Sequence, residues 1–320
     1  MKISEIYYNV GTLLYCPANN KNIARNIIEN RFGDNYSLAL CLEDTINDDY
    51  VDEAEKILVN SLEEIYLALK NDLKFFLPDI FIRVRYPSQI EKITNMLNDS
   101  FQLIKGFIFP KFSLDNADNY IEETKKIILL HNRKIYIMPV LESPCILDLN
   151  SRYVLLYELK NKLDDIEDLV LNIRIGGNDL CNAFGIRRNE YQTIHDIKPI
   201  NDIISDIITV FGRDYCLSAP VWEYFSGKNW TKGLKKEIEK DILSGFIGKT
   251  AIHPNQLDFI NDSFKISRID FDDACQILED LKYKKALVSI NSNGMRMNEY
   301  KTHINWAIKT YFMAKRYGIK

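Results

Sequence analysis

The chain has 320 residues, 46% of them hydrophobic and 27% charged, which is typical of a globular protein and enough for one large α/β barrel or two ordinary domains. Its net charge of -4 argues against a nucleic-acid-binding surface, which is normally basic. No apolar run approaches the roughly 20 residues that span a bilayer, and the first residues lack the hydrophobic region of a secretory signal.

The six cysteines are scattered along the chain, and no two of them form a Cys-x-x-Cys pair. A chain of this length needs no disulfide framework, so we expect reduced thiols in a cytoplasmic protein. The four histidines never recur at the i,i+3 or i,i+4 spacing of helical zinc ligands, which argues against a zinc site.

Short apolar segments alternate with amphipathic helical patterns up to residue 252. Strands are predicted over residues 12–16, 37–42, 80–85, 106–109, 135–141, 169–175, 215–219 and 245–252. Helices are predicted over residues 20–31, 49–70, 88–100, 117–131, 152–164, 201–211 and 222–244. This alternation indicates parallel strands, because parallel neighbours need crossover connections.

Several of the predicted strands are apolar throughout, as expected for strands that are covered on both faces. Closing eight of them into a barrel takes about 250 residues, close to the length of this region. We therefore predict an α/β fold, a (β/α)8 TIM barrel as a catalytic domain over residues 1–256. An open, doubly wound sheet is the structural alternative.

The sequence changes in character after residue 253. Residues 255–261, 270–284 and 298–317 have helical patterns with no strand predicted between them, and a turn or loop is predicted at residues 291–294. We therefore predict a helical C-terminal extension over residues 257–320. The last helix carries an apolar face that must pack on the flank of the barrel or on a neighbouring subunit: Ile304, Ala307, Ile308, Tyr311 and Phe312.

Two acidic residues directly follow neighbouring predicted strands. Glu142 follows residues 135–141, and Asp179 follows the strand over residues 169–175 and its glycine pair. In a (β/α)8 barrel, the carboxyl ends of the strands form the rim of the active site. Two carboxylates, completed by water and substrate oxygens, suit Mg2+. The sequence therefore favours a metal-assisted enzyme with these two ligands, with helix capping as the alternative role for each.

Charged residues also follow the second and third predicted strands. Glu43 and Asp44 end the second strand, where a helix cap or a solvated loop is the alternative interpretation. Arg83 and Arg85 alternate on the third strand, and side chains two apart share a face. Both would then point into the barrel mouth, where a charge needs a partner. That partner is a substrate anion or the acidic pair, and a purely structural salt bridge is the alternative.

Lys111 follows the fourth predicted strand, where it could pair with an acid, bind a carboxylate or form a Schiff base, which requires a lowered pKa. Gly176 and Gly177 follow the sixth strand and permit close backbone approach. Residues 248–250 read Gly-Lys-Thr, but residue 243 is Leu, so the spacing of a phosphate-binding loop is absent. His253 precedes a Pro that can begin a helix, which favours a structural role.

Together, these segments resemble the citrate lyase beta-subunit-like group of the HpcH/HpaI aldolase superfamily over roughly residues 11–256. In that resemblance Cys41-Leu-Glu-Asp44 corresponds to the family's DLED motif, and Arg83-Val-Arg85 corresponds to RVN. The motifs keep the family's order at spacings compatible with a barrel: residues 14–20, 41–44, 83–85, 109–111, 141–142, 177–180 and 248–256.

The resemblance implies a Mg2+-dependent (β/α)8 barrel that cleaves or forms carbon–carbon bonds, often with acyl-CoA substrates. Glu142 and Asp179 would bind the metal, and Arg83 would stabilise an enolate or a carboxylate oxygen. An oligomer is also implied, commonly a trimer built partly through the C-terminal extension. The expected partner is thus a small anionic substrate, with neither nucleic acid nor membrane involved.

The resemblance assigns supporting roles to other residues of the predicted rim. Glu43 and Asp44 would orient metal-bound water and the basic residues, and Lys111 would support that network. Substrate contacts are expected from Arg83, Arg85, Gly177 and Asn178.

Four departures from the family pattern concern the CoA ester and the exact reaction. Residues 11–12 are Gly-Thr where the family has an Arg-Ser pair that helps hold the CoA phosphates, Arg85 replaces an Asn, and residues 218–220 lack an Asp. The late acidic position is Asn298, with Glu299 next to it, and an amide cannot take up a proton at neutral pH. The departures indicate a divergent carbon–carbon bond lyase branch.

Three functions follow from these observations. The first is a Mg2+-dependent carbon–carbon lyase or aldolase-like enzyme acting on an oxo or hydroxy acid through a stabilised enolate. The second is a related Mg2+-dependent hydrolase of thioesters or phosphate esters, which the extra Arg85 and the missing Asp would suit. The third is a non-catalytic, metabolite-binding subunit on the same scaffold, which Asn298 would suit.

Overall fold

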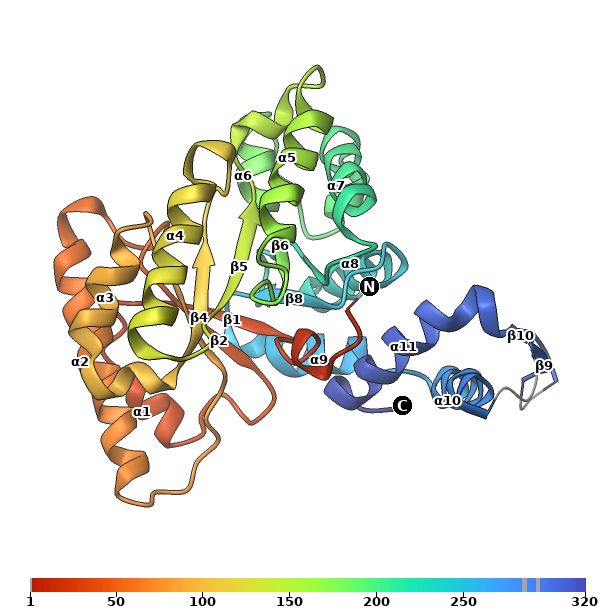
Figure 1. Ribbon diagram of the computed structural model, residues 1–320, viewed down its shortest axis with the longest axis horizontal. Coiled ribbons are helices and arrows are strands. Elements are labelled where there is room, and N and C mark those ends of the chain that lie inside the picture. The colour runs from red at the N-terminus through yellow and green to blue at the C-terminus, as the bar shows by residue number, and fades with distance from the viewer. Residues whose placement is uncertain (1, 284–286, 292–293) are drawn as a thin grey trace.

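The computed structural model describes residues 2–283, 287–291 and 294–320, which form an α/β barrel with a smaller helical lobe beside it (Figure 1). Eight parallel strands close the barrel in chain order, since each pairs with the next and β8 pairs with β1. The predicted TIM-barrel fold is therefore confirmed. The strands are β1 (Leu13–Pro17), β2 (Ser37–Cys41), β3 (Ile80–Arg83), β4 (Ile104–Phe109), β5 (Tyr136–Leu141), β6 (Ile173–Ile175), β7 (Leu217–Ala219) and β8 (Gly248–Ala251).

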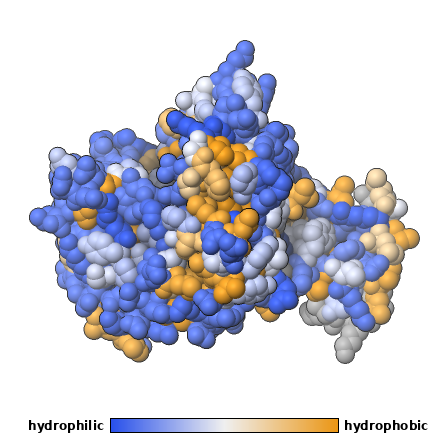
Figure 2. All heavy atoms as spheres, turned by 90° about the horizontal axis from the view of Figure 1, so that it is seen from above, coloured by the Kyte–Doolittle hydropathy of each residue, from blue (hydrophilic) through white to orange (hydrophobic). Residues whose placement is uncertain are grey.

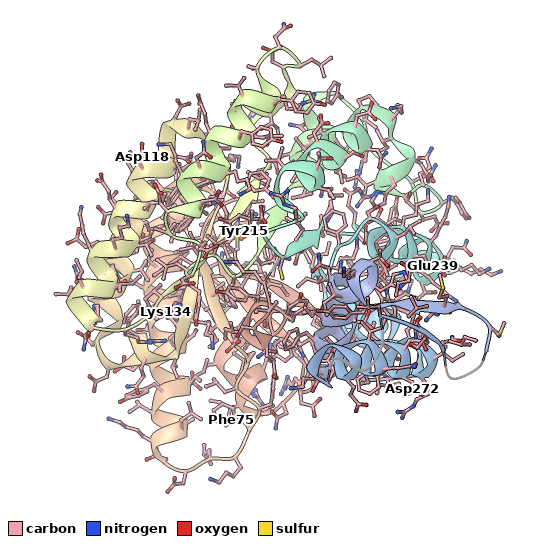
Figure 3. All side chains as sticks on the ribbon, turned by 45° about the vertical axis from the view of Figure 1, so that its right-hand side comes forward. Phe75, Asp118, Lys134, Tyr215, Glu239 and Asp272 are labelled. Carbon is pink, nitrogen blue, oxygen red and sulfur yellow. The ribbon has the colours of Figure 1, made fainter. Side chains whose placement is uncertain are left out.

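Helices cover the outside of the barrel and bury one apolar face each. In α7, for example, the residues at helical spacing Ile200, Ile203 and Ile207 are fully buried. Charged side chains such as Asp118 and Glu239 lie on the exposed faces (Figure 3). The helices are α1 (Ile23–Ile28), α2 (Val51–Lys70), α3 (Gln89–Leu97), α4 (Leu114–His131), α5 (Arg152–Asp164), α6 (Gly177–Ala183), α7 (Lys198–Phe211) and α8 (Trp230–Leu243).

Several element boundaries differ from the sequence prediction. The sixth strand begins at Ile173, because the chain before it touches β5 only through an isolated bridge between Val170 and Ile137. Helix α6 was not predicted, since its seven residues are too few for a clear periodic pattern. The predicted helix from residue 222 begins instead at Trp230, because the side chain of Gln256 binds the carbonyls of Trp222 and Tyr224 in an irregular segment.

The C-terminal region adds α9 (Leu257–Phe264), α10 (Arg268–Tyr283) and α11 (Tyr300–Tyr317). The expectation of no strand in this region was wrong, because β9 (Val288–Ile290) and β10 (Met297–Glu299) form an antiparallel hairpin. Its strands are too short for a recognisable alternation. Residues 292 and 293 of the predicted turn lie outside the described residues.

The apolar face of α11 packs within its own chain. Phe312 stacks on Tyr8 with ring centroids 5.0 Å apart, and Tyr311 stacks on Phe271 at 6.1 Å. Ala307 packs with Ala274 of α10 in a small separate core. Of the two alternatives for this face, the barrel flank and the adjoining α10 are thus the observed partners. The domain boundary at residue 256 stays a prediction, since α9 also packs into the barrel core.

The small lobe exposes apolar side chains around its hairpin. Figure 2 shows hydrophobic side chains on the surface of this lobe. In the hairpin, Val288, Ile290 and Met297 are all more than half exposed. Within the described ranges, no helix is both long and apolar enough to cross a membrane. All six cysteines are free thiols.

Candidate functional site

A cavity of about 260 Å³ opens at the carboxyl ends of the barrel strands. It receives Tyr15 from β1, Arg83 from β3, and Glu142 from just beyond β5. Strand β6 and the turn into α6 supply the opposite wall, and Thr250 of β8 closes the ring. The cavity therefore lies where a TIM barrel places its active site. The predicted residues that line it are Asp44, Arg83, Glu142, Gly177, Asn178 and Asp179.

Arg83 is the centre of a buried ion-pair cluster. Its Nη2 lies 2.6 Å from Glu43 Oε2, 2.9 Å from Asp44 Oδ2 and 2.9 Å from Glu142 Oε1. Burial lowers the pKa of Arg83, but the charges of Glu142 and Glu43 outweigh burial and raise it well above its ordinary value. The segments after β2 and β5 are thereby drawn together around one guanidinium at the end of β3.

Lys111 joins the same cluster from the loop after β4. Its ammonium contacts Glu43 and lies 3.1 Å from Asp44 Oδ1. Burial opposes a charge there, yet these two carboxylates raise the pKa of Lys111 above its usual value. A Schiff base requires a neutral amine, so this setting supports an ion-pairing Lys111. Its backbone has a φ of 47°, which directs its N–H to Glu142 Oε1 at 3.1 Å.

Glu142 is 3% exposed and lies against the backbone of Gly176. A Cβ atom on Gly176 would approach Glu142 Cδ to 2.7 Å and its Oε2 closer still, so only glycine leaves room for this carboxylate. Burial, together with the nearby charges of Asp179 and Glu43, raises the pKa of Glu142 to about 7, although Arg83 opposes the shift. Burial is thus the main reason why this carboxyl group resists ionisation, and the neighbouring carboxylates add to it.

Asp179 lies in the first turn of α6 and faces the same cavity as Glu142. Gly177 and Asn178 of the same turn also line the cavity, and Asn178 is exposed. Over the described ranges, no three His, Cys, Asp or Glu side chains converge into a complete metal-binding group. Two carboxylates completed by water fit a Mg2+ ion, and a divalent cation between them would neutralise the charge of both.

Arg85 lies apart from this cluster. Strand β3 ends at Arg83, so the alternation that would place both arginines on one face does not extend to residue 85. The Arg85 guanidinium binds the carbonyl of Ile46 and lies 2.6 Å from Asp48 Oδ1, on a loop. This geometry matches the structural salt bridge considered as the alternative, and a substrate contact by Arg85 stays a prediction.

Arg174 is a cavity residue that the sequence analysis did not single out. It lies in the middle of β6, is 2% exposed, and donates from Nη2 to Thr250 Oγ1 at 2.6 Å. Its signal in the sequence is a charged residue inside the apolar run that ends at Ile175. A charged residue in the middle of a buried strand indicates that the barrel interior is polar around that residue.

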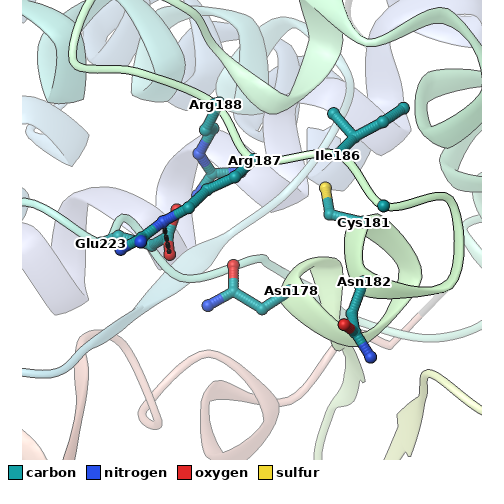
Figure 4. Close-up of a pocket in the computed structure, with 8 residues that line it drawn as sticks. Asn178, Cys181, Asn182, Ile186, Arg187, Arg188 and Glu223 are labelled. Atoms are coloured by element: carbon teal, nitrogen blue, oxygen red, sulfur yellow. Dashed lines mark ion pairs between the residues drawn. The ribbon is translucent and has the colours of Figure 1, made fainter.

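A second hollow of about 370 Å³ adjoins the cavity and shares Asn178 with it (Figure 4). Cys181 and Asn182 of α6 form one wall. Arg187 and Glu223 form an ion pair at 3.6 Å across the other wall. Both hollows therefore border the first turn of α6.

The Gly-Lys-Thr segment of β8 has a structural role. Lys249 points out of the barrel, is fully buried, and lies 2.9 Å from Glu237 and 2.7 Å from Asp241 of α8. His253 accepts a hydrogen bond from the N–H of Asn255 and stacks on a phenylalanine, in agreement with the structural role expected for it. The segment thus joins β8 to α8 and holds the following turn.

The late polar residues lie on the hairpin of the small lobe. Asn298 in β10 is 4% exposed and approaches the side chain of Gln276 at 3.5 Å. The backbone N–H of Glu299 donates to His303. Gly11 and Thr12 precede β1, at the end of the strand opposite the cavity, and Thr12 donates to Asn261 of α9. Residues 11–12 therefore do not line this cavity, and their effect on CoA binding stays a prediction.

A family model described as C-C_Bond_Lyase of the TIM-Barrel fold matches residues 4–319. The chain belongs to this family. The predicted relation to citrate lyase beta-subunit-like proteins is thereby confirmed at the level of the family. A search of the curated proteins finds no match.

Solved structures of related folds cover nearly the whole chain. CitE from Mycobacterium tuberculosis, in complex with magnesium, acetoacetate and coenzyme A, has a TM-score of 0.61 at 15% identity, covering 97% of this chain and 99% of its own. A citrate lyase from Burkholderia xenovorans has a TM-score of 0.71 at 12% identity, covering 97% and 93%. Haloferax volcanii malate synthase has a TM-score of 0.62 at 12% identity, covering 95% and 87%. These likenesses show the shared fold.

Proposed function

We propose that this member of the carbon–carbon bond lyase family is a Mg2+-dependent enzyme that cleaves or forms a carbon–carbon bond in an oxo or hydroxy acid. The observation that carries the proposal is the pairing of Glu142 and Asp179 at one cavity, with Arg83 beside them. The crystal structure of the Mycobacterium tuberculosis CitE contains magnesium and acetoacetate, which supports the same chemical class here.

Glu142 and Asp179 would hold the Mg2+ ion, with water and substrate oxygens as the remaining ligands. When bound, the ion would supply positive charge that polarises the carbonyl of the substrate acid. Its positive charge would also offset the burial and the neighbouring negative charges that raise the pKa of Glu142. Gly176 contributes by leaving room for the Glu142 carboxylate.

The remaining residues of the cluster would position and neutralise charge. In a hydroxy acid, cleavage would break the carbon–carbon bond while the hydroxyl loses its proton to water and becomes a carbonyl. The electron pair of the broken bond would remain on the departing fragment as an enolate, whose oxygen becomes negative. Arg83 is fixed by three carboxylates, and its Nε is buried without a partner among the described residues. A preorganised cation of this kind stabilises developing negative charge without reorganisation.

Glu43 and Asp44 would set the orientation of both basic residues. Glu43 contacts Arg83 through Oε2 and Lys111 through Oε1, so it joins the two cations. Asp44 does the same from a more exposed position. Burial raises the pKa of Asp44, but its contacts with Glu43, Arg83 and Lys111 outweigh burial and hold it below its usual value. Asp44 is therefore ionised at neutral pH and suited to ordering water.

Product analysis with the purified protein tests this proposal. Hydroxy and oxo acids, free and as CoA esters, would be incubated with Mg2+, and the products identified by NMR. We expect release of an oxo acid that depends on Mg2+ and is abolished in Glu142→Gln and Asp179→Asn. Turnover that both variants retain would contradict the proposal, and hydrolysis without an oxo acid would favour the Mg2+-dependent hydrolase instead.

We also propose that the protein forms a homo-oligomer, with a trimer favoured. The exposed apolar side chains of the β9–β10 hairpin support it. Light scattering coupled to gel filtration tests the assembly. A monomer that persists at high protein concentration would contradict it.

A further inference from the structure

A buried arginine without a carboxylate partner lies in the wall of the cavity. Arg174 is 2% exposed, and within the described ranges no carboxylate oxygen lies within 4.0 Å of its guanidinium nitrogens. Its Nη2 is hydrogen-bonded to Thr250, and Tyr15 lies near the guanidinium, while Nε and Nη1 are buried and make no hydrogen bond among the described residues. A buried, unpaired cation is costly for a folded protein, so a partner outside this chain is the simplest reason for its presence.

Polar atoms without partners continue around Arg174. Ser218 is its direct neighbour on β7, is 1% exposed, and has an unpaired Oγ. Asn172 lies two residues before Arg174, just outside β6, and both of its amide atoms are buried and unpaired among the described residues. The described residues thus leave a band of donors and acceptors unsatisfied around β6, where buried groups are normally hydrogen-bonded.

This band lies below the proposed metal ligands. Arg174 pairs in register with Val140, which is two residues before Glu142 on β5. Two strand residues correspond to a depth of about 6.6 Å. A small acid bound beside Glu142 and Asp179 could therefore place a second group against the Arg174 guanidinium. This second group would lie about one to three atoms further along the chain of the acid.

The two arginines of the cavity, at its rim and at its floor, differ in how their charge is neutralised. Arg83 at the rim is neutralised by three carboxylates, whereas Arg174 has none within ion-pair distance in the described part of the chain. Thr250 fixes the guanidinium by accepting from Nη2, so its other nitrogens are held in place. A planar guanidinium with fixed donors is suited to a carboxylate or a phosphate.

We propose that Arg174 binds a second acidic group of the substrate, a carboxylate or a phosphate, so that the substrate is a small diacid held between the Glu142–Asp179 pair and the floor of the cavity. The inference rests on the proposed function, since the first acidic group is placed by those two residues. Thr250 acts as a positioning residue for the guanidinium.

Three ligands that share one 2-oxo acid group test the proposal. Calorimetric titrations with Mg2+ present would compare 2-oxobutyrate, which has no second acid, with oxaloacetate and with phosphonopyruvate. We expect the wild type to bind one of the two diacids about 10- to 100-fold more tightly than 2-oxobutyrate. The tighter of the two identifies carboxylate or phosphate as the group recognised.

Arg174→Met keeps an unbranched, largely apolar side chain and removes the guanidinium with its charge. We expect this variant to bind 2-oxobutyrate as the wild type does and to lose the preference for a diacid. Its melting temperature should be unchanged or raised, because an unpaired buried charge has been removed. Thr250→Val should reduce the preference only in part, since it releases the guanidinium without removing it.

The outcomes separate this inference from the proposed function. If the wild type binds 2-oxo acids with Mg2+ but shows no preference for a diacid, or if Arg174→Met keeps that preference, water fills the band and the inference is overturned while the proposed function stands. If the wild type binds none of the three acids, the proposed function fails and the inference fails with it.

Discussion

Gly176 is predicted to be essential because the Glu142 carboxylate lies against its Cα. A Cβ at this position would lie 2.7 Å from Glu142 Cδ and closer to Oε2, whereas ordinary contacts begin at 3.4 Å. The backbone φ of Gly176 is -87°, so alanine meets no conformational obstacle and the clash is the whole effect. Relief requires the carboxylate to move by about 1 Å, a displacement that typically costs about 100-fold in function.

Gly177→Ala is the matched control for Gly176→Ala. Its Cβ would lie 2.8 Å from Pro220 Cβ and close to Ile194, so it crowds apolar side chains instead of Glu142. Overpacking of either kind costs about 1–3 kcal/mol, and thermal unfolding should show a similar loss for both variants. Calorimetric titration with Mn2+ should show weakened binding only for Gly176→Ala. Equal metal affinity in the two variants would refute the reasoning.

Three further predictions concern the buried charges. Without metal, the free energy of unfolding of the wild type should fall by about 3 kcal/mol as the pH rises from 4.5 to 7, because the folded pKa of Glu142 is raised. Glu142→Gln should lack this fall when both proteins are unfolded in urea. The same pH dependence in the variant and the wild type would contradict the prediction. Arg83→Met should lower the free energy of unfolding by about 3–5 kcal/mol, since it leaves carboxylates buried and unpaired. Arg85→Met should lower it by under about 1 kcal/mol in the same assay, because its partner Asp48 is 91% exposed. Comparable losses for the two variants would count against a stabilising role of the Arg83 cluster. Lys249→Met should cost about 3–5 kcal/mol without changing Mn2+ affinity, and a lost metal site would show that β8 does more than support the fold.

Much of the barrel could be predicted because its strands are buried on both faces and its helices are amphipathic. The rim residues Glu142 and Asp179 followed from the same reasoning, since a residue just beyond a parallel strand must lie at the mouth. Elements of three to seven residues, such as β9, β10 and α6, carry too little periodicity to be recognised.

Side-chain direction near a strand end could not be predicted in the same way. Arg85 was placed with Arg83 by strand alternation, but β3 ends at Arg83 and the chain then turns toward Asp48. Arg174 was overlooked because apolar neighbours made β6 look like an ordinary buried strand. Only the structure shows that its guanidinium enters the cavity without a carboxylate partner within ion-pair distance among the described residues.

The central claim is that Glu142 and Asp179 hold a divalent cation at the mouth of the barrel. Crystals soaked with Mn2+ and measured at the manganese absorption edge test it most directly. We predict one strong anomalous peak per chain, with a carboxylate oxygen of each residue at about 2.0–2.3 Å. No peak at this position, or a peak held by other side chains, would contradict the claim.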